Sequence, residues 1–94
     1  MVARDDLADG GAAHVAATVA AIRRRNPGSA VEVLISDLKG DPAALDVVAA
    51  ARPEVWNHNI ETVPRLQRAV RPQASYARSL AVLIGLRDRW LGHP

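Results

Sequence analysis

At 94 residues, the chain is long enough for one small domain and too short for a complete eight-stranded α/β barrel, which takes about 250 residues. Hydrophobic residues make up 49% of it but aromatic residues only 3%, with no Phe, so a core must be built from Ala, Val, Leu and Ile. Twelve basic residues nearly balance ten acidic ones, which leaves a formal charge of +2. This balance argues against a nucleic-acid-binding protein, in which basic residues cluster on one face together with aromatic ones.

The only run of basic residues, Arg23 to Arg25, falls in the last turn of an expected helix. Cations are favourable there because they face the exposed carbonyl groups of the helix end. No apolar segment reaches the roughly 18 residues of a membrane span, and no basic, apolar and small-residue order of a secretory signal occurs in the sequence, so we expect a cytoplasmic protein without a membrane partner. The absence of cysteine excludes disulfides.

The first part of the chain predicts one helix and one strand. Residues 1–11 are typical of a loop, with acidic and turn-forming residues. Residues 12–25 are expected to be helical, ending at the turn of Asn26, Pro27 and Gly28. Residues 31–35, with the sequence VEVLI, are short, apolar and β-branched, which predicts a buried parallel strand. The apolar face of the helix is formed by Val15, Val19 and Ile22.

The second part predicts three more helices and one strand. Asp41 is expected to cap a helix that runs to Arg52 and Pro53, and residues 54–57 form a short strand. Residues 61–70 are expected to be helical, and Ser75 to cap a last helix that runs to Trp90. Alternating strands and helices indicate an α/β fold with a parallel sheet. The expected buried residues of the three helices are, in order, Leu45, Val48 and Ala49; Val63, Leu66 and Val70; and Leu80, Leu83, Ile84 and Leu86.

Polar residues gather where the second strand should end: Asn57, His58, Asn59 and Glu61. The carboxyl ends of parallel strands are where α/β proteins bind ligands. Because side chains alternate along a strand, Asn57 and Asn59 share one face and His58 points to the other. We therefore expect the two asparagines to act as a ligand pair. His58 is expected to be a partly buried histidine with its hydrogen bonds satisfied, in preference to a proton-transfer group.

Three blocks of this sequence resemble one enzyme family. The first is RDDL at 4–7 followed by DGG at 9–11, and the second is VEVLI with Asp37 and Gly40 after it. The third is NHNIETVPRL at 57–66, which continues through Val70, Arg71 and Pro72 to Tyr76, Arg78, Ser79 and Leu80. In this order and spacing the blocks resemble lipoyl synthase, a radical S-adenosylmethionine enzyme, over residues 4–83.

The resemblance implies a fold and a reaction. Residues 1–94 would form a single partial (β/α) barrel, about three successive βα units of a radical-SAM TIM-like barrel, with a divergent tail at 85–94. The family inserts two sulfur atoms, at C6 and C8 of an octanoyl group carried by a lipoyl domain or H-protein. It uses S-adenosylmethionine and two [4Fe-4S] clusters.

The resemblance also implies roles for individual residues. Asp5 or Asp6 would hold the amino group of S-adenosylmethionine, since a carboxylate pairs with an ammonium group. Asn57 and Asn59 would hold the ribose, Glu61 would accept a bond from a hydroxyl, and Arg71 would pair with a carboxylate.

Simpler roles are available for the charged residues and the aromatic ones. Asp5 and Asp6, like Asp9, can instead cap the following helix, and Arg71 can cover the carbonyl groups that end its own helix. Trp56 and Tyr76 are expected to pack rather than to stack on a ligand.

One departure from the family limits what this chain can do alone. The family binds its clusters through cysteines, and this sequence has none. We therefore expect the chain alone to be inactive and to hold neither cofactor firmly. The alternative is a non-catalytic truncated remnant or a protein-interaction module, which associates with itself through open sheet edges.

Overall fold

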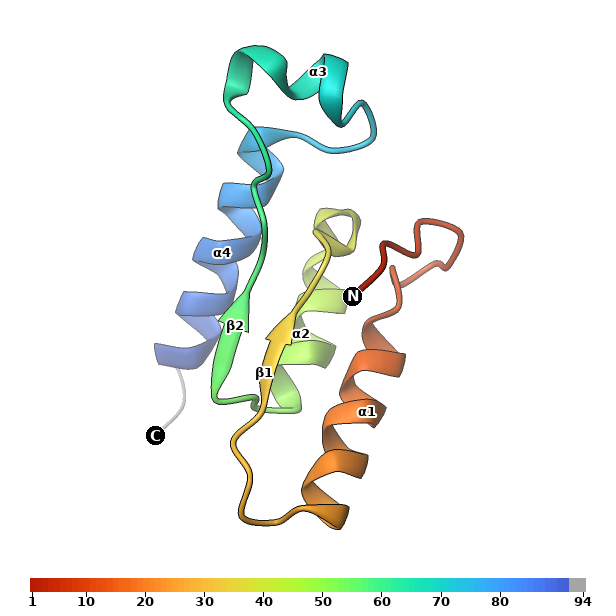
Figure 1. The fold of residues 1–94 in the computed structure, drawn as a ribbon, viewed down its shortest axis with the longest axis vertical. Helices are drawn as coiled ribbons and strands as arrows, with labels where there is room; N and C mark the ends of the chain where they lie inside the picture. Colours follow the sequence, from red (N-terminus) through yellow and green to blue (C-terminus); the bar gives the residue numbers. More distant parts are fainter. Residues whose placement is uncertain (92–94) are drawn as a thin grey trace.

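The computed structural model describes residues 1–91 and shows a small α/β fold (Figure 1). Its two strands, β1 (Glu32–Leu34) and β2 (Val55–Asn57), form a parallel pair in which Val33 lies opposite Trp56. The α-helices of this part of the chain are α1 (Ala12–Arg25), α2 (Pro42–Ala50), α3 (Gln67–Val70) and α4 (Tyr76–Leu91). Two short 3-10 helices, η1 (Leu38–Gly40) and η2 (Pro64–Leu66), follow the strands. The expected α/β alternation with a parallel sheet is confirmed.

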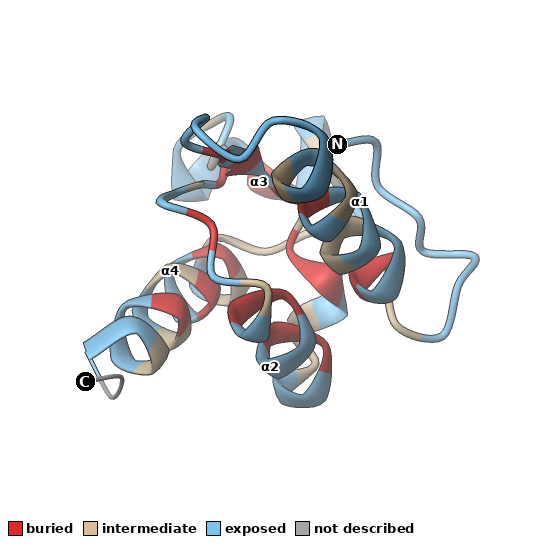
Figure 2. Ribbon diagram, turned by 90° about the horizontal axis from the view of Figure 1, so that it is seen from below, coloured by how far each residue is buried: buried red, intermediate tan, exposed pale blue. Residues whose placement is uncertain are grey.

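The core lies between one face of the sheet and three helices. On β1 and its flanks, Val31, Val33 and Ile35 are buried, whereas Glu32 and Leu34 on the opposite face are exposed. Helix α2 contacts both α1 and α4 and lies between them (Figure 2). The opposite face of the sheet has no helix over it in residues 1–91, as the exposure of Leu34, Val55 and Asn57 shows.

The predicted helix boundaries agree with the local hydrogen bonds. Helix α1 ends where the N–H of Asn26 bonds to the carbonyl of Ile22. The Asp41 carboxylate accepts a bond from the Ala43 N–H at 3.0 Å, which confirms Asp41 as the cap of α2. Ser75 Oγ accepts from the Arg78 N–H at 3.0 Å and caps α4 in the same way. Within residues 1–91, no helix is both long and apolar enough to cross a membrane.

The helix predicted for residues 61–70 is wrong in extent. Glu61 adopts a left-handed backbone with φ of 73°, and only η2 and the single turn of α3 follow it. The expected apolar face of Val63, Leu66 and Val70 is exposed, with Val70 57% accessible. Most helical stability comes from packing of an apolar face. Without a surface against these three residues, the helix is reduced to a short turn around buried Gln67.

The buried faces of two other helices also differ from the expectation. In α4 the expected burial of Leu86 is confirmed, but the other buried residues are Ser79 and Val82, and Leu80 and Ile84 are exposed. In α1, Ile22 is exposed although Val19 is buried. In each helix the apolar stripe is wider than the surface that packs against it, so part of the stripe stays exposed to solvent. The expected divergent tail at 85–94 begins inside α4, which continues to Leu91, and residues 92–94 lie outside the described part.

Candidate ligand-binding site at the strand ends

Two adjoining cavities lie where β1 and β2 end. The first, of about 260 Å³, is lined by Ala3, Asp5, Ser36, Asp37 and the 71–74 turn. The second, of about 220 Å³, lies against Asn59, Glu61 and the buried ring of His58, with Leu34 and Ile35 below. Ala3, Ser36 and Arg71 line both. A typical small-molecule site has about 300 to 1,000 Å³. Each cavity alone is therefore small for such a site, and the two together form one elongated candidate site.

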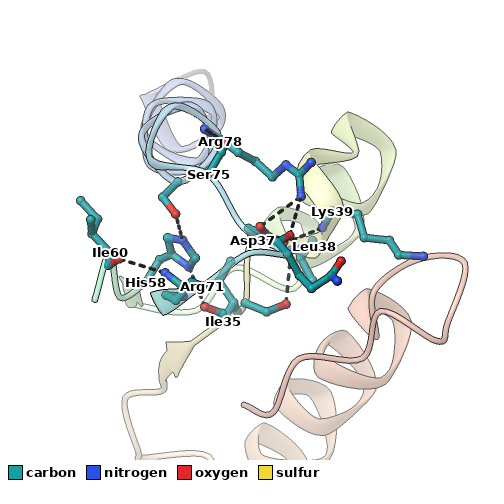
Figure 3. Close-up of polar contacts among 12 residues, drawn as sticks. Ile35, Asp37, Leu38, Lys39, His58, Ile60, Arg71, Ser75 and Arg78 are labelled. Carbon is teal, nitrogen blue, oxygen red and sulfur yellow. Dashed lines mark hydrogen bonds and ion pairs between the residues drawn. The ribbon is translucent and has the colours of Figure 1, made fainter. Parts of the chain in front are cut away.

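Arg71 lies between the two cavities. Its Nη1 donates to the carbonyl of Ile60 at 2.9 Å and to that of Asn59 at 3.3 Å (Figure 3). These carbonyls belong to the segment after β2, so the alternative in which Arg71 covers the end of its own helix is wrong. No ion pair of Arg71 is found within residues 1–91. The guanidinium is fixed in place through one nitrogen and keeps its charge for a ligand.

The acidic residues of the N-terminal segment have different environments. Asp5 lines the first cavity. Asp6 instead forms an ion pair with Arg4 at 2.8 Å, and the hydrogen bond from Arg4 lowers the pKa of Asp6. Asp9 accepts bonds from the backbone N–H groups of Ala13 and Gly11, which lower its pKa. Capping of α1 is therefore confirmed for Asp9, whereas Asp5 and Asp6 make no such bond.

The two asparagines share the open face of the sheet, as their alternation predicts, but only one reaches a cavity. Asn59 lies beyond the end of β2 and lines the second cavity together with Glu61. Asn57 is still inside β2, opposite Leu34, and its carbonyl accepts the Ile35 N–H at 2.9 Å. Of the predicted site residues, the structure brings together Asp5, Asn59, Glu61 and Arg71 and leaves Asp6 and Asn57 outside.

His58 is buried on the helix side of the sheet, as expected for a histidine with its hydrogen bonds satisfied. Its Nδ1 is 2.9 Å from the carbonyl oxygen of Ile35, and its Nε2 is 2.9 Å from Ser79 Oγ. Trp56 packs against the hydrophobic core, which agrees with its expected packing role.

The Asp37–Arg78 contact beside the first cavity was not predicted from the sequence. Asp37 is buried and accepts from the Lys39 N–H at 3.0 Å, and Arg78 Nη1 lies 3.5 Å from its other oxygen. A Cβ on Gly40 would lie 3.2 Å from Arg78 Cγ, so glycine makes room for this arginine. The signal in the sequence was a polar pair, Ser36 and Asp37, directly after a buried strand.

The site has oxygen and guanidinium groups but no metal-binding set. Within residues 1–91, no group of three or more His, Cys, Asp or Glu side chains lies close enough to hold a metal ion. The whole sequence contains no cysteine, so these residues do not fit an iron–sulfur cluster, which is held by thiolates. The arrangement fits a polar organic ligand that carries both charges.

Curated relatives of the chain share one name. Lipoyl synthases of Chlorobaculum parvum and Rubrobacter xylanophilus are each 65% identical to it over 82 residues, or 87% of the chain. The lipoyl synthase of Methylococcus capsulatus is 54% identical over 99% of the chain. By sequence, the chain belongs with the lipoyl synthases. It spans 28%, 26% and 29% of the length of these three relatives, so it corresponds to a segment of them. No protein-family model matches the chain.

Proposed function

We propose that this lipoyl synthase segment provides part of an S-adenosylmethionine site, in which Arg71 and Asp5 hold the methionyl end and Asn59 and Glu61 the ribose. The observation that supports this most is the position of Arg71 between two cavities, with Asp5 in one and Glu61 in the other. The methionyl end carries a carboxylate and an ammonium group, which an arginine and an aspartate complement. A ribose diol both donates and accepts hydrogen bonds, as the asparagine side chain does.

In a full-length enzyme we propose that the strands and helices of this chain belong to a (β/α) barrel. The exposed sheet face of Leu34, Val55 and Asn57 would then face the barrel interior. The reaction of such an enzyme is insertion of sulfur at C6 and C8 of an octanoyl group on a carrier protein. The role we assign to this chain is to bind and orient S-adenosylmethionine, since it contributes no cysteine to a cluster.

Titration of the ¹⁵N-labelled chain with S-adenosylmethionine tests this proposal. We expect weak binding, with amide shifts confined to residues 3–5, 36–37, 59–61 and 71–74. Replacing a charged hydrogen-bonding partner costs about 1.5–3 kcal/mol. Asp5→Asn and Arg71→Gln should therefore each weaken binding by about tenfold or more.

The matched control is Asp6→Asn, because Asp6 pairs with Arg4 and lines neither cavity. This variant should bind like the wild type. The proposal is wrong if saturating S-adenosylmethionine leaves all of these amides unmoved, or if Asp6→Asn and Asp5→Asn weaken binding equally. Nanomolar affinity would contradict the partial nature of the site.

A second candidate function, self-association through the sheet, is favoured by the open side of β1. The odd-numbered residues around β1 bond to β2, as Val31 and Ile35 do, so the backbone groups of Glu32 and Leu34 face the other way. The Leu34 carbonyl accepts a hydrogen bond from the N-terminal amine of Met1, so this edge is open only in part within residues 1–91. An open strand edge beside an exposed apolar residue promotes pairing with another chain. Sedimentation velocity of the wild type and Leu34→Lys tests this: oligomers that the variant removes would support association, and a monomeric wild type would exclude it.

A further inference from the structure

His58 joins the ends of both strands to α4. It directly follows β2, is only 7% exposed, and contacts Ile35 at the end of β1 through Nδ1. Its Nε2 contacts the hydroxyl of Ser79, which lies in the first turn of α4 and is fully buried. Figure 3 shows the ring of His58 between the strand end and this helix.

The identity of these partners fixes the position of one ring hydrogen. A backbone carbonyl oxygen only accepts hydrogen bonds, so Nδ1 must carry the hydrogen that is donated to Ile35. In the neutral ring, Nε2 then accepts a bond from the Ser79 hydroxyl, which can donate. Both ring nitrogens are used inside the protein, and neither is left for proton transfer to a ligand in the cavity.

The segment that follows His58 has few other attachments. Residues 58–63 form neither helix nor strand. Thr62 bonds to the carbonyl of Ile60, and Arg71 bonds to the carbonyls of Asn59 and Ile60 from the cavity side. His58 is therefore the inner attachment of a segment whose outer attachment is Arg71, and Asn59 and Glu61 both lie on that segment.

We infer that His58 is a positioning residue for the candidate site. Its two hydrogen bonds hold residues 59–61 against β1 and α4, so that Asn59 and Glu61 line the same cavity as Arg71. The role rests on the proposed function only for the identity of the ligand, S-adenosylmethionine. The positioning itself is measurable on the free protein.

Amide hydrogen exchange of the 94-residue chain with Ser79→Ala is the central experiment. This variant removes the partner of Nε2 and leaves the ring in place. The net loss of a buried hydrogen bond is worth about one factor of ten in an equilibrium constant. We expect the hydrogen-bonded amides next to this contact, those of Thr62, Arg78 and Ser79, to exchange about tenfold faster, whereas those of α1 and α2 keep the wild-type rate. Equal acceleration throughout the chain would mean a contribution to global stability alone and would overturn the inference.

Two substitutions of His58 keep the test decisive if Ser79→Ala fails to fold. His58→Asn keeps a donor near Nδ1 and should retain part of the local protection, whereas His58→Leu should lose all of it. His14→Asn is the matched control, because His14 is exposed on α1, and it should change nothing in residues 58–62. A wild-type ¹H–¹⁵N spectrum of the ring with no hydrogen on Nδ1 would also overturn the inference.

The same samples, titrated with S-adenosylmethionine, separate the two proposals. Binding by the wild type that Ser79→Ala weakens supports both. No binding by the wild type, together with local acceleration of exchange in Ser79→Ala, overturns the proposed ligand and supports the positioning role. Binding that Ser79→Ala leaves unchanged, with unchanged exchange, supports the proposed function and overturns the role of His58.

Discussion

The two ends of the strand pair carry the same kinds of charged side chain, arginines and carboxylates, but differ in how these side chains are paired. At the amino end, Glu54 accepts from Arg23 Nη1 at 2.9 Å and from the Val31 N–H at 2.6 Å, and Arg23 also donates to the carbonyl of Arg52. At the carboxyl end, Arg71 donates only to carbonyl groups, and no bond of Asp5 or Glu61 to another side chain is found within residues 1–91. The amino end pairs its arginine with its carboxylate. At the carboxyl end Asp37 has a partner, Arg78 at 3.5 Å, whereas Arg71, Asp5 and Glu61 stay separate around the cavities within residues 1–91.

This difference indicates where stability and binding reside in the molecule. Paired charges at the amino end connect α1, β1 and the start of β2, which fixes the elements to one another. Separated charges at the carboxyl end remain available to a ligand, at the edge of the sheet where α/β barrels place their sites. At the carboxyl end the Asp37–Arg78 ion pair, 3.5 Å long, joins the segment after β1 to α4. The other contacts that hold this end are the apolar face of β1, the η1 turn and His58.

The largest predicted effect tests the apolar support beneath the cavities. Ile35 is 3% exposed, and its neighbour Leu34 is 42% exposed on the opposite face. Ile35→Ala should destabilise the chain by about 2–5 kcal/mol, because it removes buried methyl groups and leaves a cavity. Urea denaturation followed by circular dichroism measures this change.

The control for Ile35→Ala is Leu34→Ala on the same strand. A substitution at this more exposed position should cost about 1 kcal/mol or less. Equal losses for the two variants would mean that both faces of the sheet are covered in solution, as in an oligomer that buries Leu34. In that case the difference between the two ends of the strand pair would have to be described for the oligomer, with a second chain against Leu34.

A smaller effect is predicted for the turn that receives Arg78. Gly40 has φ of 69°, a left-handed conformation that costs other residues about 1–2 kcal/mol, and an added Cβ would press on Arg78. Gly40→Ala should lower the free energy of unfolding by at least this amount and shift the amide signals of Asp37. The change is measured by chemical denaturation together with an amide spectrum.

Gly28, before β1 at the amino end, is the matched control. A Cβ there meets nothing within 4 Å. Gly28→Ala should be neutral or stabilise by up to about 1 kcal/mol, since it restricts the unfolded chain. Destabilisation by Gly28→Ala as large as that by Gly40→Ala would show that the carboxyl-end turn has no special role.

Much of this fold could be predicted from sequence because local rules determine it. The cap residues Asp41 and Ser75 were predicted from residue type, and alternation along the strand predicted that His58 faces away from Asn57 and Asn59. The failures came where tertiary partners decide the result. The apolar spacing of Val63 and Val70 is helical, yet a helix needs a surface to pack against, and these residues have none in the described chain.

The candidate site shows the same division. Asn59 and Glu61 were identifiable as polar residues after a strand, and the structure places them beside one cavity. Asn57 is of the same residue type as Asn59 and faces the same way. Only the register between β1 and β2 shows that Asn57 is still within the strand, opposite Leu34. The attachment of Arg71 to Ile60 depends on how the chain returns after α3, which residue spacing does not reveal.

The smallest predicted effect concerns the amino end, where Arg23 and the Val31 N–H lower the pKa of Glu54 from 4.5 to about 2. A carboxylate with a depressed pKa stabilises the fold fully above pH 4.5 and loses this contribution as the pH falls from 4.5 to about 2.

Arg23→Ala should raise the Glu54 titration midpoint toward 4.5 without reaching it, because the Val31 N–H remains. A ¹³C carboxyl titration measures this, and Arg24→Ala, which removes a neighbouring arginine that has no ion pair within residues 1–91, is the control. Since Glu54 is exposed, the effect of Arg23→Ala on the free energy of unfolding should be small; it should be present at neutral pH and disappear as the pH falls toward 2. An equal shift in both variants would mean that general positive charge, rather than the Arg23 contact, holds Glu54 ionised, and the amino end would then not be a specific pairing.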